Sequence, residues 1–426
     1  MYKLHNDKYK LPLLIFLAIF CLICIFTSIY YGNQLLLGDL ELNNNDDVKY
    51  LRAAETLLDT GMLTYKDQEA PTVFIMPGLV FALAPFVGIF GKLGAIVAFR
   101  IFSAILQTFT LYVLYLIIKK VFNSSKIAFV TILLNLIYVA NIYVTTLILS
   151  ETIFTFLLMN LIYICMFAVE KKNNKLYILG GVVWALSIYF KPIMLAFPLV
   201  VFVLMLINKY TIKEMITYAI LPLVIVILCM SPWIVRNYIT FDRFIPLTLS
   251  SGNPKLQGAY INYDQNPSYK DEIDFSNVGD FGTEIENNET ETKRANAVIK
   301  YNLENNTLEY IYWMTIGKTF ENFKTPFIWY NLYGISFNVY LVIHWIILVL
   351  GIVGMCISIF SKRFKDNNLK FLLIAIIIFF NIVHLPYYCF SRYVYPIMPI
   401  LISFSALSII YLSEKIKEKR KRLWKS

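Results

Sequence analysis

The chain has 426 residues, of which 58% are hydrophobic and only 15% are charged. A soluble protein of this length carries about 25% charged residues on average, so the composition argues against a water-soluble globular fold. The formal net charge of +10 is spread over short clusters between apolar runs, which argues against a nucleic-acid-binding domain with one basic face. We therefore expect an all-α polytopic membrane protein, whose surface is largely covered by lipid.

The apolar runs, taken in chain order, predict about ten membrane-spanning helices, because one span needs about 20 apolar residues. The predicted spans lie at residues 11–31, 101–118, 127–147, 151–169, 177–191, 192–208, 215–232, 337–360, 370–387 and 394–412. A further apolar run at residues 73–90 is interrupted by Pro77, Gly78, Pro85 and Gly88. We interpret this run as a re-entrant or interfacial helix rather than a span.

The lysines and arginines predict which side of the membrane each connection occupies. If residues 73–90 do not cross, the basic clusters all fall on one side, in the N-terminus, 119–126, 170–176, 208–214, 361–370 and the C-terminal tail. By the positive-inside rule this side is the cytoplasm, so both termini are predicted to be cytoplasmic. If the run crossed, the clusters after it would face outward, so we prefer the first arrangement.

This topology divides the chain into three parts. Residues 1–232 form an N-terminal transmembrane module that includes a first outer loop at 32–100. Residues 233–336 form an extracytoplasmic loop or small subdomain, and residues 337–426 form the C-terminal transmembrane helices with a basic cytoplasmic tail. The middle of the second part, Gln257–Asn306, is rich in Asn, Asp and Glu, and its composition fits either a folded unit or a mobile loop.

Three acidic residues stand at predicted helix starts on the outer side. Asp46 and Asp47 precede a short helix whose apolar residues recur at helical spacing, and Glu151 stands where a span begins. Acids at these positions commonly cap the helix and complement its dipole. The alternative is that they supply chemistry at the outer surface.

Three basic residues stand on the same side. Arg236 follows the end of a span, Lys191 ends another span, and Arg392 lies in a short outer turn between the last two spans. Basic residues at this depth often serve as interfacial anchors, but an arginine can also bind a phosphate with its planar fork. Charged residues at membrane depth are costly, so acids and bases on one face favour a functional site.

These segments, in this order, resemble the GT-C superfamily of polytopic glycosyltransferases, and within it the bacterial aminoarabinose-transferase and protein-mannosyltransferase-like branch. The resemblance covers most of the chain. It rests on Asp46, Tyr50, Ala53, Leu57, Gly61, Met76, Pro77, Gly78, Arg100, Ser150, Glu151, Lys191, Pro192, Pro232, Trp233, Arg236, Asn237, Tyr238, Arg392, Tyr393, Pro396 and Pro399. The chain departs from the pattern in its shorter length, in Asp47 where the branch usually has Glu, and in Lys191 where Arg is commoner.

The resemblance implies a membrane enzyme that moves a hexose or pentose from a polyprenyl-phosphate-linked donor to a hydroxyl acceptor. Transfer would occur on the extracytoplasmic face with inversion, in glycosylation of a cell-envelope glycan, a lipid or a protein. Asp46 would be the general base that takes the acceptor's proton. Members of the superfamily differ in their need for a divalent metal such as Mg²⁺ or Mn²⁺, for which Asp46 and Glu151 would be the ligands.

The resemblance also assigns roles to the remaining residues. The implied catalytic group is Asp46, Asp47 and Glu151; the donor-phosphate group is Arg236, Arg392 and Lys191; the substrate-pocket group is Tyr50, Tyr393 and His384. A flippase for polyprenyl-linked sugars would share the topology and the basic contacts, but it needs no acid on the outer surface. An accessory membrane subunit needs none of these residues, so Asp46 together with Glu151 favours the transferase.

Overall fold

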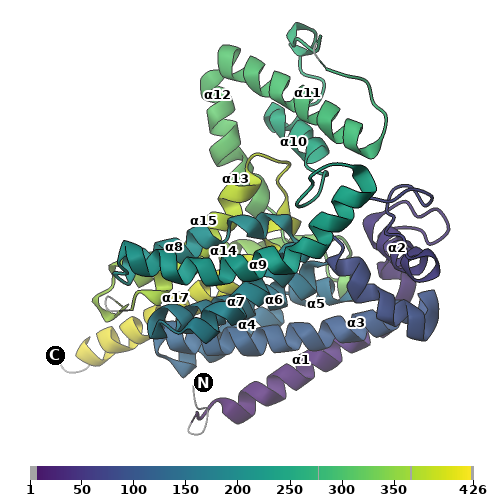
Figure 1. The fold of residues 1–426 in the computed structure, drawn as a ribbon. Helices are drawn as coiled ribbons and strands as arrows, with labels where there is room; N and C mark the ends of the chain where they lie inside the picture. Colours follow the sequence, from purple (N-terminus) through teal and green to yellow (C-terminus); the bar gives the residue numbers. More distant parts are fainter. Residues whose placement is uncertain (1–6, 277, 365–366, 424–426) are drawn as a thin grey trace.

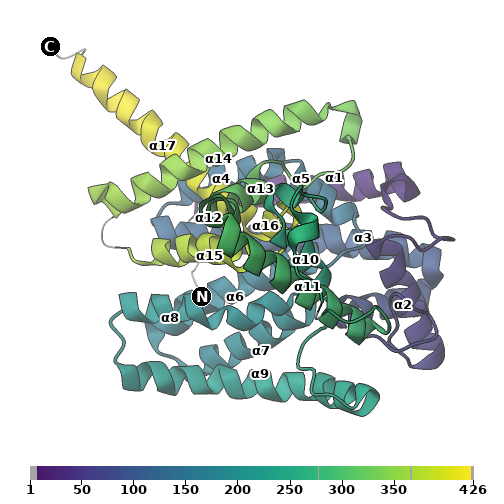
Figure 2. The same cartoon turned by 90° about the horizontal axis from the view of Figure 1, so that it is seen from above.

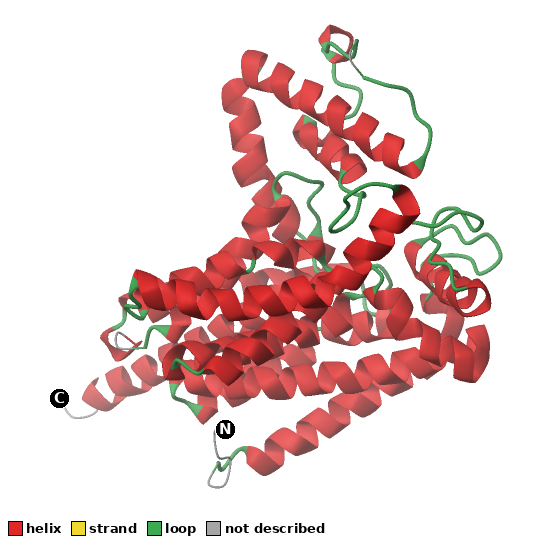
Figure 3. Cartoon of the chain, viewed as in Figure 1, coloured by secondary structure: helices red, strands yellow, loops and turns green. Residues whose placement is uncertain are grey.

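The computed structural model describes residues 7–276, 278–364 and 367–423, and these residues form helices and loops without a β-strand (Figure 3). The long helices are α1 (Lys10–Tyr31), α3 (Gly78–Phe122), α4 (Ser125–Ile137), α6 (Glu151–Lys171), α7 (Asn174–Phe190), α8 (Pro198–Ile207), α9 (Ile212–Phe241), α14 (Phe337–Phe360), α15 (Leu369–His384) and α17 (Met398–Leu423). The remaining helices are α2 (Asp46–Thr60), α5 (Ala140–Tyr143), α10 (Gly252–Ala259), α11 (Glu284–Asn305), α12 (Thr307–Tyr312), α13 (Lys318–Phe323) and α16 (Ser391–Val394). The prediction of an all-α fold is confirmed for the described residues.

Within the described residues, six helical segments are long and apolar enough to cross a membrane, so the chain is a multi-pass membrane protein. They are Lys10–Leu35, Gly78–Phe122, Glu151–Lys171, Ile212–Phe241, Phe337–Phe360 and Ser391–Lys421. A bent pair would make a seventh, and three shorter apolar helices, Asn174–Phe190, Pro192–Ile207 and Leu369–His384, account for the other predicted spans. The expected count of about ten stays a prediction.

Residues 78–90 of the apolar run at 73–90 form the first part of α3, which is broken at Gly91, and residues 73–77 precede the helix. Gly91 has φ 66° and ψ 171°, a conformation that is readily reached only without a Cβ atom. The part before the break, 78–90, is about 20 Å long at 1.5 Å per residue, which is less than the roughly 30 Å of a bilayer core. Its length favours an interfacial helix, and Figure 1 shows this part turned away from the rest of α3 at its right-hand end.

The predicted span at residues 127–147 is not one straight helix. Helix α4 ends at Ile137, and the next helical segment, Ala140–Thr146, is bent from it by 71°. The Asn141 side chain donates hydrogen bonds to the backbone and side-chain oxygens of Asn135, at 2.9 and 3.1 Å, across this bend. Neither proline nor glycine marks the bend, so the apolar pattern alone did not reveal it.

The helices run side by side between two ends of the bundle. In Figure 1, α1 begins and α17 ends on the left, whereas α2 lies on the right. We call the right side the α2 end. The left side is the lysine end, because the connections 170–176 and 208–214 lie there.

A helical unit of α10, α11 and α12 projects from the bundle, and seen from above it covers α13 and α16 (Figure 2). It has a small apolar core of its own, which consists of Ala259, Tyr260, Ile273, Ala295 and Val298. These apolar residues are scattered through the polar middle segment of the sequence.

Candidate active site

Asp46 is the first residue of α2, but it does not cap the helix. The cap is Asn45, whose side-chain oxygen accepts a hydrogen bond from the Asp46 backbone N–H at 2.7 Å. The Asp46 carboxylate accepts instead from the Tyr65 hydroxyl at 2.7 Å and from Arg392 Nη1 at 3.1 Å. Its side chain is 43% exposed, so the carboxylate is held in position and still open to a reactant.

Asp47 is the neighbouring acid, but its environment is different. It is 1% exposed, and its carboxylate accepts the backbone N–H groups of Leu37 at 2.6 Å and Val48 at 2.8 Å. Burial raises the pKa of Asp47 above its ordinary value, although these hydrogen bonds and the charge of Arg100 oppose the rise. Asp47 therefore anchors the preceding loop to α2 and is closed to a large substrate.

Glu151 is the first residue of α6 and is completely buried. Its Oε1 atom accepts from Lys191 Nζ at 2.9 Å and from Arg392 Nε at 2.7 Å. Its Oε2 atom has no hydrogen-bond partner among the described residues. Ser150, the residue before it, makes no side-chain cap. Glu151 thus joins two basic residues instead of serving mainly as a helix cap.

We call Asp46, Glu151, Lys191 and Arg392 the charged cluster. They come from α2, the start of α6, the junction between α7 and the 3₁₀ turn Pro192–Ala196, and α16. Arg392 bridges the two acids, and the two acids balance the two bases in formal charge. The cluster brings the α2 loop, the bundle and the last outer turn to one point.

The charged cluster does not fit the metal site that the sequence resemblance left open. Among the described residues, no group of three or more His, Cys, Asp or Glu side chains could hold a metal ion. The two candidate ligands, Asp46 and Glu151, already share the guanidinium of Arg392, so a cation occupies the position between them.

Aromatic side chains stand beside the charged cluster. Tyr50 and Tyr65 have ring centroids 5.1 Å apart, and burial, together with the Asp46 charge, raises the pKa of both hydroxyls. Both therefore remain protonated donors at neutral pH. The ring of Tyr393, the residue after Arg392, stacks on His384 at 4.8 Å, and His384 Nδ1 lies 2.6 Å from the Phe380 carbonyl.

Arg236 is the predicted phosphate-binding residue that the structure does not bring into the cluster. Its Nη1 donates to the Thr72 carbonyl at 2.7 Å and to Asn237 Oδ1 at 3.0 Å. Its guanidinium also lies 5.3 Å from the ring centroids of Trp233 and Phe241. In this position Arg236 connects the end of α9 to the loop before α3, and its role toward a donor phosphate stays a prediction.

Sequence reasoning missed the partners that hold the cluster from outside. Tyr65 lies in a polar loop with no periodic pattern, so nothing pointed to its bond with Asp46. The turn that leads to Arg392 is also held from outside: Lys318 Nζ donates to the Leu385 carbonyl at 2.7 Å, and the Cys389 N–H donates to the Tyr263 hydroxyl at 2.9 Å.

The fold is similar to that of a solved oligosaccharyltransferase. A crystal structure of the Archaeoglobus fulgidus oligosaccharyltransferase, tethered with an acceptor peptide containing the NVT sequon, matches 97% of this chain with a TM-score of 0.57 and 13% identity. The chain spans about half of that protein, 51% of its length. Two structures of ArnT from Cupriavidus metallidurans also match. The one bound to undecaprenyl phosphate has a TM-score of 0.44 and 12% identity, and the apo form 0.40 and 15%.

These ArnT matches cover 94% and 93% of this chain, and 78% and 77% of the ArnT chains. In sequence, residues 70–235 match the family described as Dolichyl-phosphate-mannose-protein mannosyltransferase, a segment that includes Glu151 and Lys191. No curated protein matches the chain. The family match and the fold confirm the resemblance of this chain to the GT-C superfamily of membrane glycosyltransferases.

Proposed function

We propose that the protein is a membrane glycosyltransferase that moves a sugar from a polyprenyl-phosphate donor to a hydroxyl acceptor on the outer membrane face. The observation that carries this proposal is the charged cluster, in which a half-exposed carboxylate lies beside two bases. A flippase has no need of an exposed, oriented acid at this point. A transferase needs both a base for the acceptor and positive charge for the leaving group.

In the proposed reaction, the acceptor oxygen attacks the anomeric carbon of the sugar while Asp46 takes the hydroxyl proton. The bond between the anomeric carbon and the phosphate oxygen breaks, and its electron pair leaves with the polyprenyl phosphate. Attack from the side opposite the leaving group inverts the anomeric configuration. Tyr65 holds one oxygen of the Asp46 carboxylate and Arg392 holds the other, so the base is oriented before the acceptor binds.

The negative charge on the phosphate grows as the bond breaks, and Lys191 and Arg392 supply the balancing charge. Arg392 uses Nε and Nη1 for the two acids, which leaves Nη2 for a phosphate oxygen. Lys191 is partly exposed and spends one of its three donors on Glu151. Glu151 would act as a positioning residue, because it orients both bases without itself being open to substrate.

The proposal is tested by Asp46→Asn, which keeps the size of the side chain and an oxygen that can accept from Tyr65. The purified protein is given labelled undecaprenyl-phosphate hexoses and pentoses as donor probes, and release of undecaprenyl phosphate is measured. We expect turnover to fall about 100-fold or more, since a positioned general base contributes about 10²–10⁴. The matched control is Asp59→Asn at the exposed end of the same helix, which should leave turnover unchanged.

Three results would contradict the proposal. The first is near-normal turnover in Asp46→Asn with the folded fraction unchanged. The second is transfer from a nucleotide sugar in membranes stripped of lipid carriers. The third is movement of the labelled lipid across a vesicle bilayer without any release of polyprenyl phosphate, which would indicate a flippase.

A further inference from the structure

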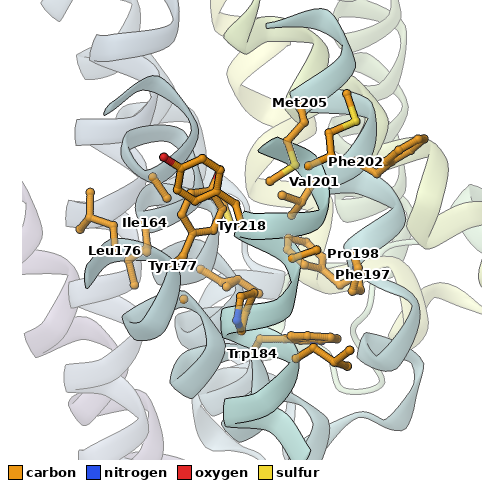
Figure 4. Close-up of a pocket in the computed structure, with 18 of the residues that line it drawn as sticks. Ile164, Leu176, Tyr177, Trp184, Phe197, Pro198, Val201, Phe202, Met205 and Tyr218 are labelled. Carbon is orange, nitrogen blue, oxygen red and sulfur yellow. The ribbon is translucent and has the colours of Figure 1, made fainter. Parts of the chain in front are cut away.

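An apolar cavity of about 350 Å³ lies between α6, α7, α8 and α9 (Figure 4). Tyr177 and Tyr218 form one side of it, and Pro198 and Val201 lie on the facing side, with Trp184 at one end. The volume falls in the range of about 300–1,000 Å³ that is usual for ligand cavities. Among the described residues, no acidic or basic side chain lines it, so its contents must be largely hydrocarbon.

The cavity extends along α7 from Trp184, about 10 Å from Lys191 of the charged cluster, to Tyr177. Tyr177 stands near the start of α7, and Lys191 stands at the other end of the same helix. At 1.5 Å per residue, the helix places these two residues about 20 Å apart along its axis. The cavity therefore reaches toward the lysine end of the bundle, whereas the cluster lies at the α2 end.

The lysine end of the cavity is bordered by three tyrosines. The rings of Tyr177 and Tyr218 stack at 4.7 Å, and the hydroxyls of Tyr177 and Tyr210 lie 3.2 Å apart. The Tyr218 hydroxyl donates to the Lys172 carbonyl at 2.9 Å, and Lys172 Nζ lies 4.6 Å from the centroid of the Tyr210 ring. Tyrosines and lysines are typical of the membrane–water interface, so the cavity ends where lipid headgroups lie.

The connections at this border carry an excess of positive charge. Residues 170–176 and 208–214 contain five lysines and two glutamates, a net charge of +3. The glutamates are already paired, Glu170 with Lys120 at 2.6 Å and Glu214 with Lys172. The five lysines are all exposed: Lys171, Lys172, Lys175, Lys209 and Lys213. Basic groups beside a gap between membrane helices attract anionic lipid headgroups.

We propose that this cavity holds one acyl chain of an anionic phospholipid, whose headgroup lies against the lysines of the two connections. An apolar cavity that ends at a positively charged interface fits both parts of such a lipid. The chain would fill the space between α8 and the packed helices α6, α7 and α9, where an empty cavity would deprive the surrounding side chains of contacts. This inference does not depend on the proposed transferase activity.

The chain-binding part is tested by filling the cavity with Gly180→Leu. Gly180 lines the cavity, and a Cβ atom there would meet only Ile164 Cγ2, at an ordinary 3.6 Å, so the helix can accept a side chain. The purified protein is loaded with phosphatidylglycerol or with phosphatidylcholine of the same chains, and retained lipid is counted by native mass spectrometry. A leucine that displaces three methylenes should reduce phosphatidylglycerol retention about 60-fold, at about fourfold for each methylene.

The matched control is Leu179→Phe, which adds bulk at the residue of α7 just before Gly180, on the exposed face of the helix and outside the cavity. The headgroup part is tested by replacing Lys175 and Lys213 together with glutamine. Each lysine near a charged lipid surface contributes a factor of about five, so the pair should reduce retention about 25-fold. The control for charge is the same double change at Lys417 and Lys419 of α17, which should have little effect.

Three outcomes would overturn the inference. One is equal retention of phosphatidylcholine and phosphatidylglycerol, which would remove the headgroup preference. Another is unchanged phosphatidylglycerol retention in a folded Gly180→Leu protein. The third is displacement of the phospholipid by undecaprenyl phosphate with the same dependence on Gly180, which would assign the cavity to a polyprenyl tail. Because lipid retention is measured directly, the activity or inactivity of the Asp46→Asn protein has no bearing on these outcomes.

Discussion

Replacing the buried carboxylate with an amide in Glu151→Gln is expected to destabilise the protein strongly. The carboxylate is completely buried and balances both Lys191 and Arg392. Breaking a buried ion pair costs about 3–5 kcal/mol, because the remaining charge stays buried without its partner. Arg392 keeps Asp46 at 3.1 Å, and Lys191 is partly exposed, so we expect a loss near the lower limit, about 3 kcal/mol.

The free energy of unfolding is measured by SDS titration of the protein in mixed micelles, for the wild type and the variant. The matched control is Glu170→Gln at the other end of the same helix. Glu170 also pairs with a lysine, Lys120 at 2.6 Å, but its side chain is 50% exposed. An exposed pair contributes about 1 kcal/mol or less, so the control should unfold almost like the wild type.

A second variant separates the charge effect from packing. If unbalanced charge causes the loss, Lys191→Met combined with Glu151→Gln should be more stable than the sum of the single changes predicts, by about 0.5–3 kcal/mol. Two results would contradict this expectation: Glu151→Gln unfolds like Glu170→Gln, or the effects of Glu151→Gln and Lys191→Met are additive. Either result would mean that the cluster is hydrated and that Glu151 does not hold the two bases.

Three further predictions follow from the outer contacts. Tyr65→Phe removes the 2.7 Å hydrogen bond to the Asp46 carboxylate, so turnover should fall about 13- to 160-fold, and an unchanged rate would show that Tyr65 does not orient the base. Burial lowers the pKa of Lys318 from 10.5 to about 8. Between these two pH values the unfolded chain keeps this proton while the folded chain loses it, so the stability of the wild type should rise with pH. Thermal unfolding at pH 7–10 should show a smaller rise in Lys318→Met. In a cysteine-free background, a cysteine at Asn44 should react with an impermeant thiol reagent outside intact cells and one at Lys175 should not; reversed labelling would invert the predicted topology.

The helical class was predictable from sequence because it depends on local composition. A membrane span needs about 20 consecutive apolar residues, and the lysine clusters mark the ends of the runs. The run at residues 73–90 was recognisable as unusual from its prolines and glycines, and the structure shows the break at Gly91. The bend after Ile137 was not predictable, because it depends on Asn141 reaching Asn135 and on packing around it, with no glycine or proline to mark it.

The composition of the charged cluster was decided by tertiary structure. From the sequence, Arg236 and Arg392 were equally good candidates for binding the donor phosphate. In the structure, Arg392 donates to Glu151 and Asp46, whereas Arg236 donates to the Thr72 carbonyl. Contacts between Asp46 and Arg392 join residues that are far apart in the chain, and no local pattern encodes which distant segments will meet. Tyr65 was missed for the same reason.

Asp46 and Asp47 show most clearly what the sequence determines and what only the tertiary structure decides. They are adjacent and chemically alike, so the sequence determined that an acidic pair opens α2, but it gave no reason to separate their roles. Successive residues on a helix point about 100° apart, since one turn takes 3.6 residues. One acid therefore faces Tyr65 and Arg392 at the open site, and the other is buried against the backbone of Leu37. Which acid faces the open site and which is buried is therefore decided only when the partners pack around the helix.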